Sequence, residues 1–179
     1  LHFKTDSSEV HAHWSGGGAM NHMAATGVSG LDLYRRTAEG EWRYAGTGRP
    51  QTEATTAKLA SSARQGVEEY LLFLPLYQDV EFLYLGLDPE ASFEAVDHRA
   101  EQPIVFYGTS IVQSGCASRA GMAHPAIIRR WLDREVINLG FSGAGKMEMV
   151  MADLIAEIDA AAYILDCLPN MTDELVDER

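Results

Sequence analysis

The second half of the chain alternates short apolar runs with stretches of helical periodicity, and this alternation limits the folds open to it. The continuous apolar runs are Ile104–Tyr107, Val136–Leu139 and Ala162–Leu165. Runs of this length are typical of strands covered on both faces of a parallel sheet. Pro125 marks a helix start in the first gap. Apolar residues recur at helical spacing in both gaps, at Ile127, Ile128, Trp131 and Leu132, and at Met147, Val150, Met151, Leu154, Ile155 and Ile158.

Residues before about position 97 follow a different pattern, in which short extended runs alternate with turn clusters. The runs are Glu9–Trp14, Gly30–Tyr34, Glu41–Ala45, Glu69–Leu74 and Val80–Leu85. They predict antiparallel strands, with a hairpin between the second and third runs, and a β-sandwich is their simplest closure. We therefore expect a β-sandwich accessory domain at 1–97, a polar bridge at 97–102, and an α/β domain with a parallel sheet at 103–179.

Charge and composition narrow the possible partners. Fourteen basic residues against 26 acidic ones give a net charge of −12, which disfavours nucleic acid and anionic membrane surfaces. The longest apolar runs, such as Tyr70–Tyr77, are far shorter than the roughly 20 residues of a membrane span. Cys116 and Cys167 have no motif spacing, so we predict neither a zinc site nor a disulfide scaffold. The oligomeric state stays open.

Polar residues follow each of the three apolar runs of the second half: Ser110, Gly143 and Asn170. Because open α/β sheets bind ligands at the carboxyl ends of their strands, we expect these residues to converge. A serine hydroxyl can attack an ester carbonyl there, while backbone and side-chain amides stabilise the resulting oxyanion. Taken singly, the same residues also fit a helix cap, a turn glycine and a loop amide.

The segments around these residues resemble the first three conserved blocks of the GDSL, or SGNH, hydrolases. Tyr107–Ile111, Asn138–Gly143 and Asp166–Asn170 match the blocks in order. Thr109 stands where the family has the aspartate of its Gly-Asp-Ser motif. The resemblance implies a flavodoxin-like three-layer α/β/α domain, of which this chain holds the first part.

The resemblance also assigns roles to individual residues. It implies that Ser110 is the nucleophile and donates its own amide to the oxyanion, that Gly143 donates a second amide, and that Asn170 donates from its side chain. Arg119, in the polar loop after the nucleophile, is a weak candidate for a substrate contact. The resemblance implies neither a cofactor nor a metal.

Gly30–Tyr34 resembles the Gly-x-Asp-Leu-Tyr signature of a β-rich domain that precedes certain bacterial SGNH-type esterases. This implies a jelly-roll-like domain beside the catalytic one, in enzymes that act on O-acyl groups such as acetyl, often on carbohydrates. It also suggests a bacterial and exported enzyme, although the compartment stays open. We favour structural roles for Asp32 and Tyr34, with the carboxylate accepting backbone hydrogen bonds and the ring filling a core edge.

The base that would activate Ser110 has no obvious supplier. The family's fourth block, Asp-x-x-His, supplies the base and its orienting acid, and the sequence reaches Arg179 without it. We therefore expect a truncated chain that hydrolyses esters very slowly alone. His124 is the alternative base, although its place before Pro125 favours packing at a helix start. The first residue, Leu1, is not a methionine, which suggests a trimmed N-terminus, and no signal peptide follows it.

Two other functions are open. A non-hydrolytic acyltransferase would use the same serine site. A glycan-binding module would use exposed aromatic rings, for which Trp14 and Trp42 are candidates, although aromatic residues of a sandwich more often lie in its core.

Two further motifs are weaker. His11 and His13 share a strand face and could bind a metal, but no third ligand is identifiable, which favours a solvated face. Gly140–Met147 is one residue short of a phosphate-binding loop, because Met147 replaces the serine or threonine that would hold magnesium. We therefore place nucleotide binding below the esterase reading, with Lys146 as a helix-start residue.

Overall fold

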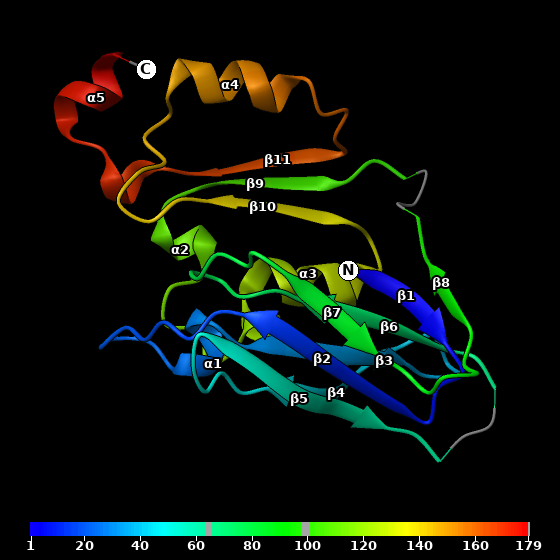
Figure 1. Cartoon of the computed structure of the whole chain (residues 1–179). Coiled ribbons are helices and arrows are strands. Elements are labelled where there is room, and N and C mark those ends of the chain that lie inside the picture. Colours follow the sequence, from blue (N-terminus) through cyan, green and yellow to red (C-terminus); the bar gives the residue numbers. More distant parts are fainter. Residues whose placement is uncertain (64–65, 98–100, 179) are drawn as a thin grey trace. The chain divides into compact units, whose positions relative to one another are not determined.

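The computed structural model describes residues 1–63, 66–97 and 101–178 (Figure 1). The chain forms two compact units. The first comprises Leu1–Asp97 and Cys116–Met122, and the second comprises the remainder. Residues 98–100 of the polar bridge that we predicted lie outside the described residues. The segment Cys116–Met122 is therefore an excursion of the second half of the sequence into the first unit.

The first unit contains two antiparallel sheets, as the alternating runs predict. A five-stranded sheet has the order β4-β3-β6-β1-β8, and a three-stranded sheet has the order β5-β2-β7. Strands β3 and β4 form the predicted hairpin. The elements are β1 (His2–Thr5), β2 (Glu9–Ser15), α1 (Ala25–Val28), β3 (Leu31–Arg36), β4 (Trp42–Gly48), β5 (Ala54–Ser61), β6 (Glu68–Phe73), β7 (Leu83–Gly86), β8 (Phe93–Ala95) and the 3-10 helix η1 (Ala120–Met122).

The core of this unit lies between the two sheets. Val10, Ala12 and Trp14 of β2 point inward, in line with the period of two that a strand imposes. They pack against buried residues of the other sheet, including Leu33 and Leu72. The two sheets therefore form a sandwich.

Trp14 offers no open ring for stacking on a sugar. The Trp14 side chain is 0% exposed, and its indole nitrogen donates a hydrogen bond to the Ser29 carbonyl at 2.9 Å. The ring of Trp42 makes an edge contact with the ring of His2 at 5.6 Å, and the guanidinium of Arg36 lies over it at 5.4 Å. The suggestion that Trp14 binds a glycan is therefore wrong, because the ring is part of the core.

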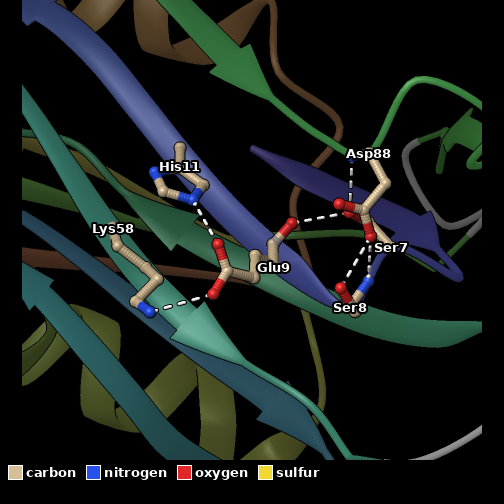
Figure 2. A network of polar contacts seen from close by, with 6 residues as sticks. All are labelled: Ser7, Ser8, Glu9, His11, Lys58 and Asp88. Carbon is tan, nitrogen blue, oxygen red and sulfur yellow. Dashed lines mark hydrogen bonds and ion pairs between the residues drawn. The ribbon is translucent and has the colours of Figure 1, made fainter.

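A polar network at the start of β2 joins three segments of the first unit (Figure 2). The Asp88 carboxylate accepts hydrogen bonds from the backbone and the hydroxyl of Ser8, both at 2.7 Å. Glu9 contacts the His11 ring and the Lys58 ammonium, each at 2.9 Å. The hydrogen bond from His11 is the main cause that lowers the pKa of Glu9. His11 is thus engaged by a carboxylate of its own strand.

The second unit contains a parallel sheet with the order β10-β9-β11, which confirms the predicted α/β arrangement. Gly140, Gly108 and Asp166 occupy one register row at the carboxyl ends of the three strands. Helices α2 and α3 lie on one side of this sheet and α4 lies on the other (Figure 1). The elements are β9 (Ile104–Gly108), α2 (Ser110–Gln113), α3 (His124–Leu132), β10 (Val136–Gly140), α4 (Met149–Ala156), β11 (Ala162–Asp166), the 3-10 helix η2 (Leu168–Asn170) and α5 (Asp173–Glu178).

Two details of the helices differ from the sequence pattern. Helix α4 begins at Met149, so Lys146 is not a helix-start residue as predicted, because Met147 adopts a φ of +60° that no α-helix contains. In α3, Trp131 is 80% exposed and Leu132 is 58% exposed, so the helical spacing overstates the buried face. Among the described residues, no helix combines the length and the apolar content needed to cross a membrane.

Candidate active site

Ser110 begins α2 immediately after β9, in a turn that Thr109 stabilises. The Thr109 hydroxyl accepts a hydrogen bond from the Ile111 amide at 3.2 Å, which is the interaction of a helix N-cap. The Thr109 amide donates to the Asp166 carbonyl at 3.1 Å. Threonine can therefore replace the aspartate of the Gly-Asp-Ser motif here, because its hydroxyl supplies the cap and its backbone continues the contact with β11.

Two glycines allow the backbones around Ser110 to approach closely. A Cβ atom at Gly108 would lie 2.4 Å from the Asp166 carbonyl oxygen. A Cβ atom at Gly140 would lie 2.0 Å from the Gln113 nitrogen. Both separations are well below van der Waals contact, so only glycine fits at either position. These glycines bring α2 against the ends of β9 and β10.

The loop after β10 runs beside the turn that holds Ser110. The Phe141 amide donates to the Gly108 carbonyl at 2.9 Å, and the Ser142 amide donates to the Gln113 side chain at 2.7 Å. Gly143 has a φ of +73°, and a Cβ atom there would meet nothing within 4 Å. The Gly143 amide donates to no protein group among the described residues. This amide is therefore available to a ligand.

Asn170 joins the third strand end to the same loop. Its side-chain nitrogen donates a hydrogen bond to the Ala144 carbonyl. A primary amide carries two N–H donors, so one of them remains for another acceptor. In the same loop, Gly145 has a φ of +69°, and a Cβ atom there would lie 2.1 Å from the Gly108 carbonyl oxygen. The structure thus brings together the three segments that carry Ser110, Gly143 and Asn170.

His124 is not brought to Ser110 in the same way. It is the first residue of α3, and its Nδ1 atom lies 3.3 Å from the Ser114 hydroxyl. Its ring meets the edge of Phe106 at 5.7 Å. Partial desolvation lowers the pKa of His124, and the charge of Asp166 opposes this effect. Among the described residues the Ser110 hydroxyl has no hydrogen-bond partner.

Arg119 belongs to the first unit, in the segment Cys116–Met122. Its Nε atom lies 3.0 Å from Oδ2 of Asp32, which is 0% exposed. No local pattern predicts this pair, because the motif that holds Asp32 and the loop that holds Arg119 are distant in the chain. Asp32 and Tyr34 have the structural contacts that we favoured for them.

The sequence also did not point to Glu148, which contributes to an apolar cavity of about 330 Å³ in the second unit. The Tyr107 hydroxyl donates a hydrogen bond to the Glu148 carboxylate. Desolvation, together with this carboxylate, raises the pKa of Tyr107 to about 12. Glu148 also accepts a hydrogen bond from the Lys146 amide at 2.8 Å. A phosphate-binding loop leads directly into a helix N-terminus, and its backbone amides point at the phosphate. Here the amide that follows Gly145, that of Lys146, already donates to the Glu148 carboxylate. The remaining residues that line the cavity are Met147, Ala152, Ile155, Ala156, Tyr163 and Leu165.

Comparison with known proteins finds relatives of both halves of the chain. Residues 101–179 match the GDSL-like lipase/acylhydrolase family, and residues 1–93 match the N-terminus of SGNH-type esterases that carries the Gly-x-Asp-Leu-Tyr motif. A GDSL-like lipase from Bacteroides ovatus is 37% identical, with a TM-score of 0.92 over 99% of this chain and 53% of that one. This chain therefore spans about half the length of that relative.

Two more distant structures share the fold. A family two carbohydrate esterase from Clostridium thermocellum, solved with cellohexaose, is 17% identical, with a TM-score of 0.58 over 81% of this chain and 45% of that one. A salicylyl-acyltransferase from a tetracycline biosynthetic pathway is 19% identical, with a TM-score of 0.67 over 99% of this chain and 48% of that one. The sequence matches none of the curated proteins with which it was compared. The two family matches together span both halves of the chain, which therefore belongs to the GDSL-like, SGNH-type esterases with a Gly-x-Asp-Leu-Tyr N-terminus.

Proposed function

We propose that this chain supplies the serine nucleophile and the oxyanion donors of an esterase that cleaves O-acyl esters, including those of carbohydrates. Ser110 attacks the ester carbonyl, and negative charge develops on the carbonyl oxygen. The backbone amides of Ser110 and Gly143 and the side-chain amide of Asn170 stabilise that charge. The observation that carries the proposal is the hydrogen bonding that holds the three strand ends together, from Asn170 to Ala144 and from Phe141 to Gly108.

The reaction then follows the course of covalent catalysis by serine. The proton of the Ser110 hydroxyl passes to a general base, the bond between the carbonyl carbon and the alcohol oxygen breaks, and the alcohol leaves with a proton. An acyl group remains on Ser110 until water releases it as a carboxylic acid. Among the described residues His124 contacts the Ser114 hydroxyl and has no contact with the Ser110 hydroxyl, so we propose that another residue supplies the base.

The charge of the chain and the fold comparisons support the substrate class. A net charge of −12 favours neutral over anionic substrates. Neutral acylated sugars satisfy this condition, and a carbohydrate esterase is among the proteins with the same fold. An acyltransferase is also among them, and transfer to a hydroxyl other than water would use the same residues.

Intact mass after treatment with a fluorophosphonate tests the nucleophile. The reagent should add once to the protein and not at all to a Ser110→Ala variant. Ser92→Ala is the matched control, since the Ser92 hydroxyl contacts Asp6 in the first unit, and it should label like the native protein. Labelling of the Ser110→Ala variant at the native rate would refute the proposal.

The same measurement locates the base. It should be made on this chain and on the longest form that its native gene encodes. Labelling of the longer form alone would place the base outside these residues. Labelling of both forms, with loss of labelling in a His124→Gln variant, would instead assign the base to His124.

Hydrolysis and transfer can be separated by supplying an acetyl ester with and without a sugar acceptor and measuring free acetate against acetylated sugar.

A second candidate function, glycan binding by the first unit, is favoured by an aromatic group on β2 and β7. The ring of His13 lies 5.1 Å from that of Phe82 and 6.2 Å from that of Tyr84. Tyr84 is 65% exposed, and the His13 Nδ1 atom lies 2.8 Å from the Thr56 hydroxyl. Exposed rings beside hydroxyl groups suit stacking on sugars. Calorimetric titration with cellohexaose should show binding that a Tyr84→Ala variant loses and a Tyr163→Phe variant keeps. No heat from the native protein would refute it.

A further inference from the structure

Asp32 is a buried carboxylate whose two oxygens serve two different parts of the chain. The side chain is 0% exposed. Oδ1 accepts a hydrogen bond from the Thr47 hydroxyl at 2.5 Å, on the neighbouring strand β4. Oδ2 accepts a hydrogen bond from the Gly121 amide at 2.9 Å and pairs with Nε of Arg119 at 3.0 Å. A buried charge is tolerated only when it is paired and hydrogen-bonded, and the segment Cys116–Met122 supplies both an amide donor and a guanidinium.

The rings around Asp32 fit this segment closely. The guanidinium of Arg119 lies over the ring of Tyr44 at 4.6 Å, and its Nη2 atom is 3.4 Å from the Tyr34 hydroxyl. A Cβ atom at Gly121 would lie 2.4 Å from the Tyr34 ring and 2.8 Å from Oδ2 of Asp32, so glycine is required there. We name this set of contacts, made by Asp32, Tyr34, Tyr44, Arg119 and Gly121, the Asp32 clasp.

Further contacts hold the rest of the segment to the first unit. The Thr26 hydroxyl donates to the Ser118 carbonyl at 2.5 Å, and the Cys116 thiol donates to the His22 carbonyl at 3.3 Å. A Cβ atom at Gly27 would lie 2.3 Å from the Ala117 carbonyl oxygen. The segment is therefore fixed along its length, and not only at the clasp.

Only Ser114 and Gly115 separate the segment from the helix that carries the proposed nucleophile. Ser110 opens α2, and Ser114 ends it with a φ of +68°. The segment starts at Cys116 and ends just before His124, and the side chains of Ser114 and His124 lie 3.3 Å apart. A helix of four residues is too short to be stable by itself, so its position depends on what holds its ends.

We propose that Asp32 is a positioning residue for Ser110, acting through the segment Cys116–Met122. This inference rests on the proposed function. In this proposal the Gly-x-Asp-Leu-Tyr motif of the first unit holds the chain that follows α2. It thereby orients the Ser110 hydroxyl. Small displacements of a reacting group lower the rate steeply, which makes such a restraint measurable.

Three substitutions separate positioning from general stability. Asp32→Asn removes the negative charge that contacts both strand β4 and the segment Cys116–Met122. Arg119→Met removes the ion pair with the segment and keeps the hydrogen bonds of Asp32 with Gly121 and with β4, and it suits the test because the Arg119 side chain is 28% exposed. Thr47→Val is the matched control, because it removes the hydrogen bonds of the Thr47 hydroxyl with Oδ1 and with the Tyr44 hydroxyl and leaves the acceptor of Gly121 intact. Arg119→Lys restores a positive charge and should recover part of the effect.

Two readouts are needed, in the form of the protein that labels at Ser110 and at a temperature where every variant is folded. The first is the second-order rate constant for fluorophosphonate addition to Ser110. The second is hydrogen exchange of the peptide that contains Gly121. We expect Arg119→Met and Asp32→Asn to slow the addition roughly 10- to 100-fold and to speed the exchange. Thr47→Val should lower the melting temperature. It should change neither the rate constant of fluorophosphonate addition nor the rate of hydrogen exchange.

The outcomes distinguish this inference from the proposed function. If the native protein does not label at Ser110, the proposed function fails and the inference fails with it. If the native protein labels, and Arg119→Met labels at the same rate although the Gly121 peptide exchanges faster, the esterase stands and the positioning role is refuted. If Thr47→Val slows labelling as much as Arg119→Met does, general destabilisation explains the effect and the positioning role is also refuted. If Asp32→Asn does not fold, Arg119→Met and Arg119→Lys carry the test.

Discussion

The side-chain amide of Asn170 donates a hydrogen bond to the carbonyl oxygen of Ala144, which ties the residues after β11 to the loop after β10. The second N–H of that amide is free for an oxyanion. An Asn170→Ala variant should therefore lower kcat for an acetyl ester by roughly 10²- to 10³-fold, the usual effect of removing one oxyanion donor. Steady-state hydrolysis of a chromogenic acetate measures it, and KM should change much less than kcat.

Asn138 provides the matched control for that substitution. Its side-chain oxygen accepts a hydrogen bond from the Gly140 amide at 3.0 Å, at the end of β10. Asn138→Ala also removes an asparagine from a strand end near the site, but it removes no donor that we assign to the oxyanion. We expect kcat to fall less than tenfold. An Asn138→Ala variant as impaired as Asn170→Ala would show that loop order, and not the Asn170 donor, controls the rate.

Two glycines of the same loop should respond differently to alanine. Gly143 has a φ of +73° and open space at its Cβ position, so Gly143→Ala adds only left-handed backbone strain, about 1–2 kcal/mol. Gly145 has a φ of +69°, and its Cβ would also lie 2.1 Å from the Gly108 carbonyl oxygen. Gly145→Ala should cost more than about 3 kcal/mol. Urea unfolding of both variants measures the difference, and equal losses would contradict the loop packing.

The hydroxyl of Tyr107 should contribute to stability through the Glu148 carboxylate. Tyr107 is 3% exposed, and its hydroxyl donates to Glu148. Tyr107→Phe should reduce the free energy of unfolding by roughly 1.5–3 kcal/mol, as expected for a hydrogen bond to a charged group. Spectrophotometric titration offers an independent check, because the variant should lose a tyrosine with a pKa of about 12. A variant as stable as the native protein would show that water replaces the contact.

The sequence predicts most of the sheet structure, because burial imposes clear periods on the strands. Strand β2 alternates between buried and partly exposed residues, and β9 is a continuous apolar run. Strand β1 (His2–Thr5) alternates in the same way but is only four residues long, and the pattern misses it, whereas the other missed strands lack these signals. Strand β5 (Ala54–Ser61) consists largely of alanine and threonine and fully buries only Thr55 and Leu59, and the three residues of β8 are all exposed. Pairing with neighbours, not composition, makes them strands.

In the candidate site, too, local patterns predict some residues and miss others. Ser110, Gly143 and Asn170 could be predicted because each follows a strand of one parallel sheet, and register brings such ends together. The partner of Asp32 could not be predicted, since Asp32 and Gly121 are 89 residues apart. Only the path of the chain through both units brings them into contact. The Gly-x-Asp-Leu-Tyr motif therefore has a visible structural role that no local pattern encodes.

His124 should make stability depend on pH. Partial desolvation of its ring lowers its pKa below the ordinary value of a histidine, about 6.5. The unfolded chain therefore binds the proton first as the pH falls, so the stabilising effect is present above about pH 6.5 and is lost below it. The melting temperature of the native protein, minus that of a His124→Gln variant, should decrease between pH 7.5 and pH 5. In a Ser114→Ala background the decrease should persist, because desolvation and not the contact with Ser114 is its main cause. A difference that is flat, or that grows as the pH falls, would mean that the folded protein binds the proton on His124 at least as well as the unfolded chain does.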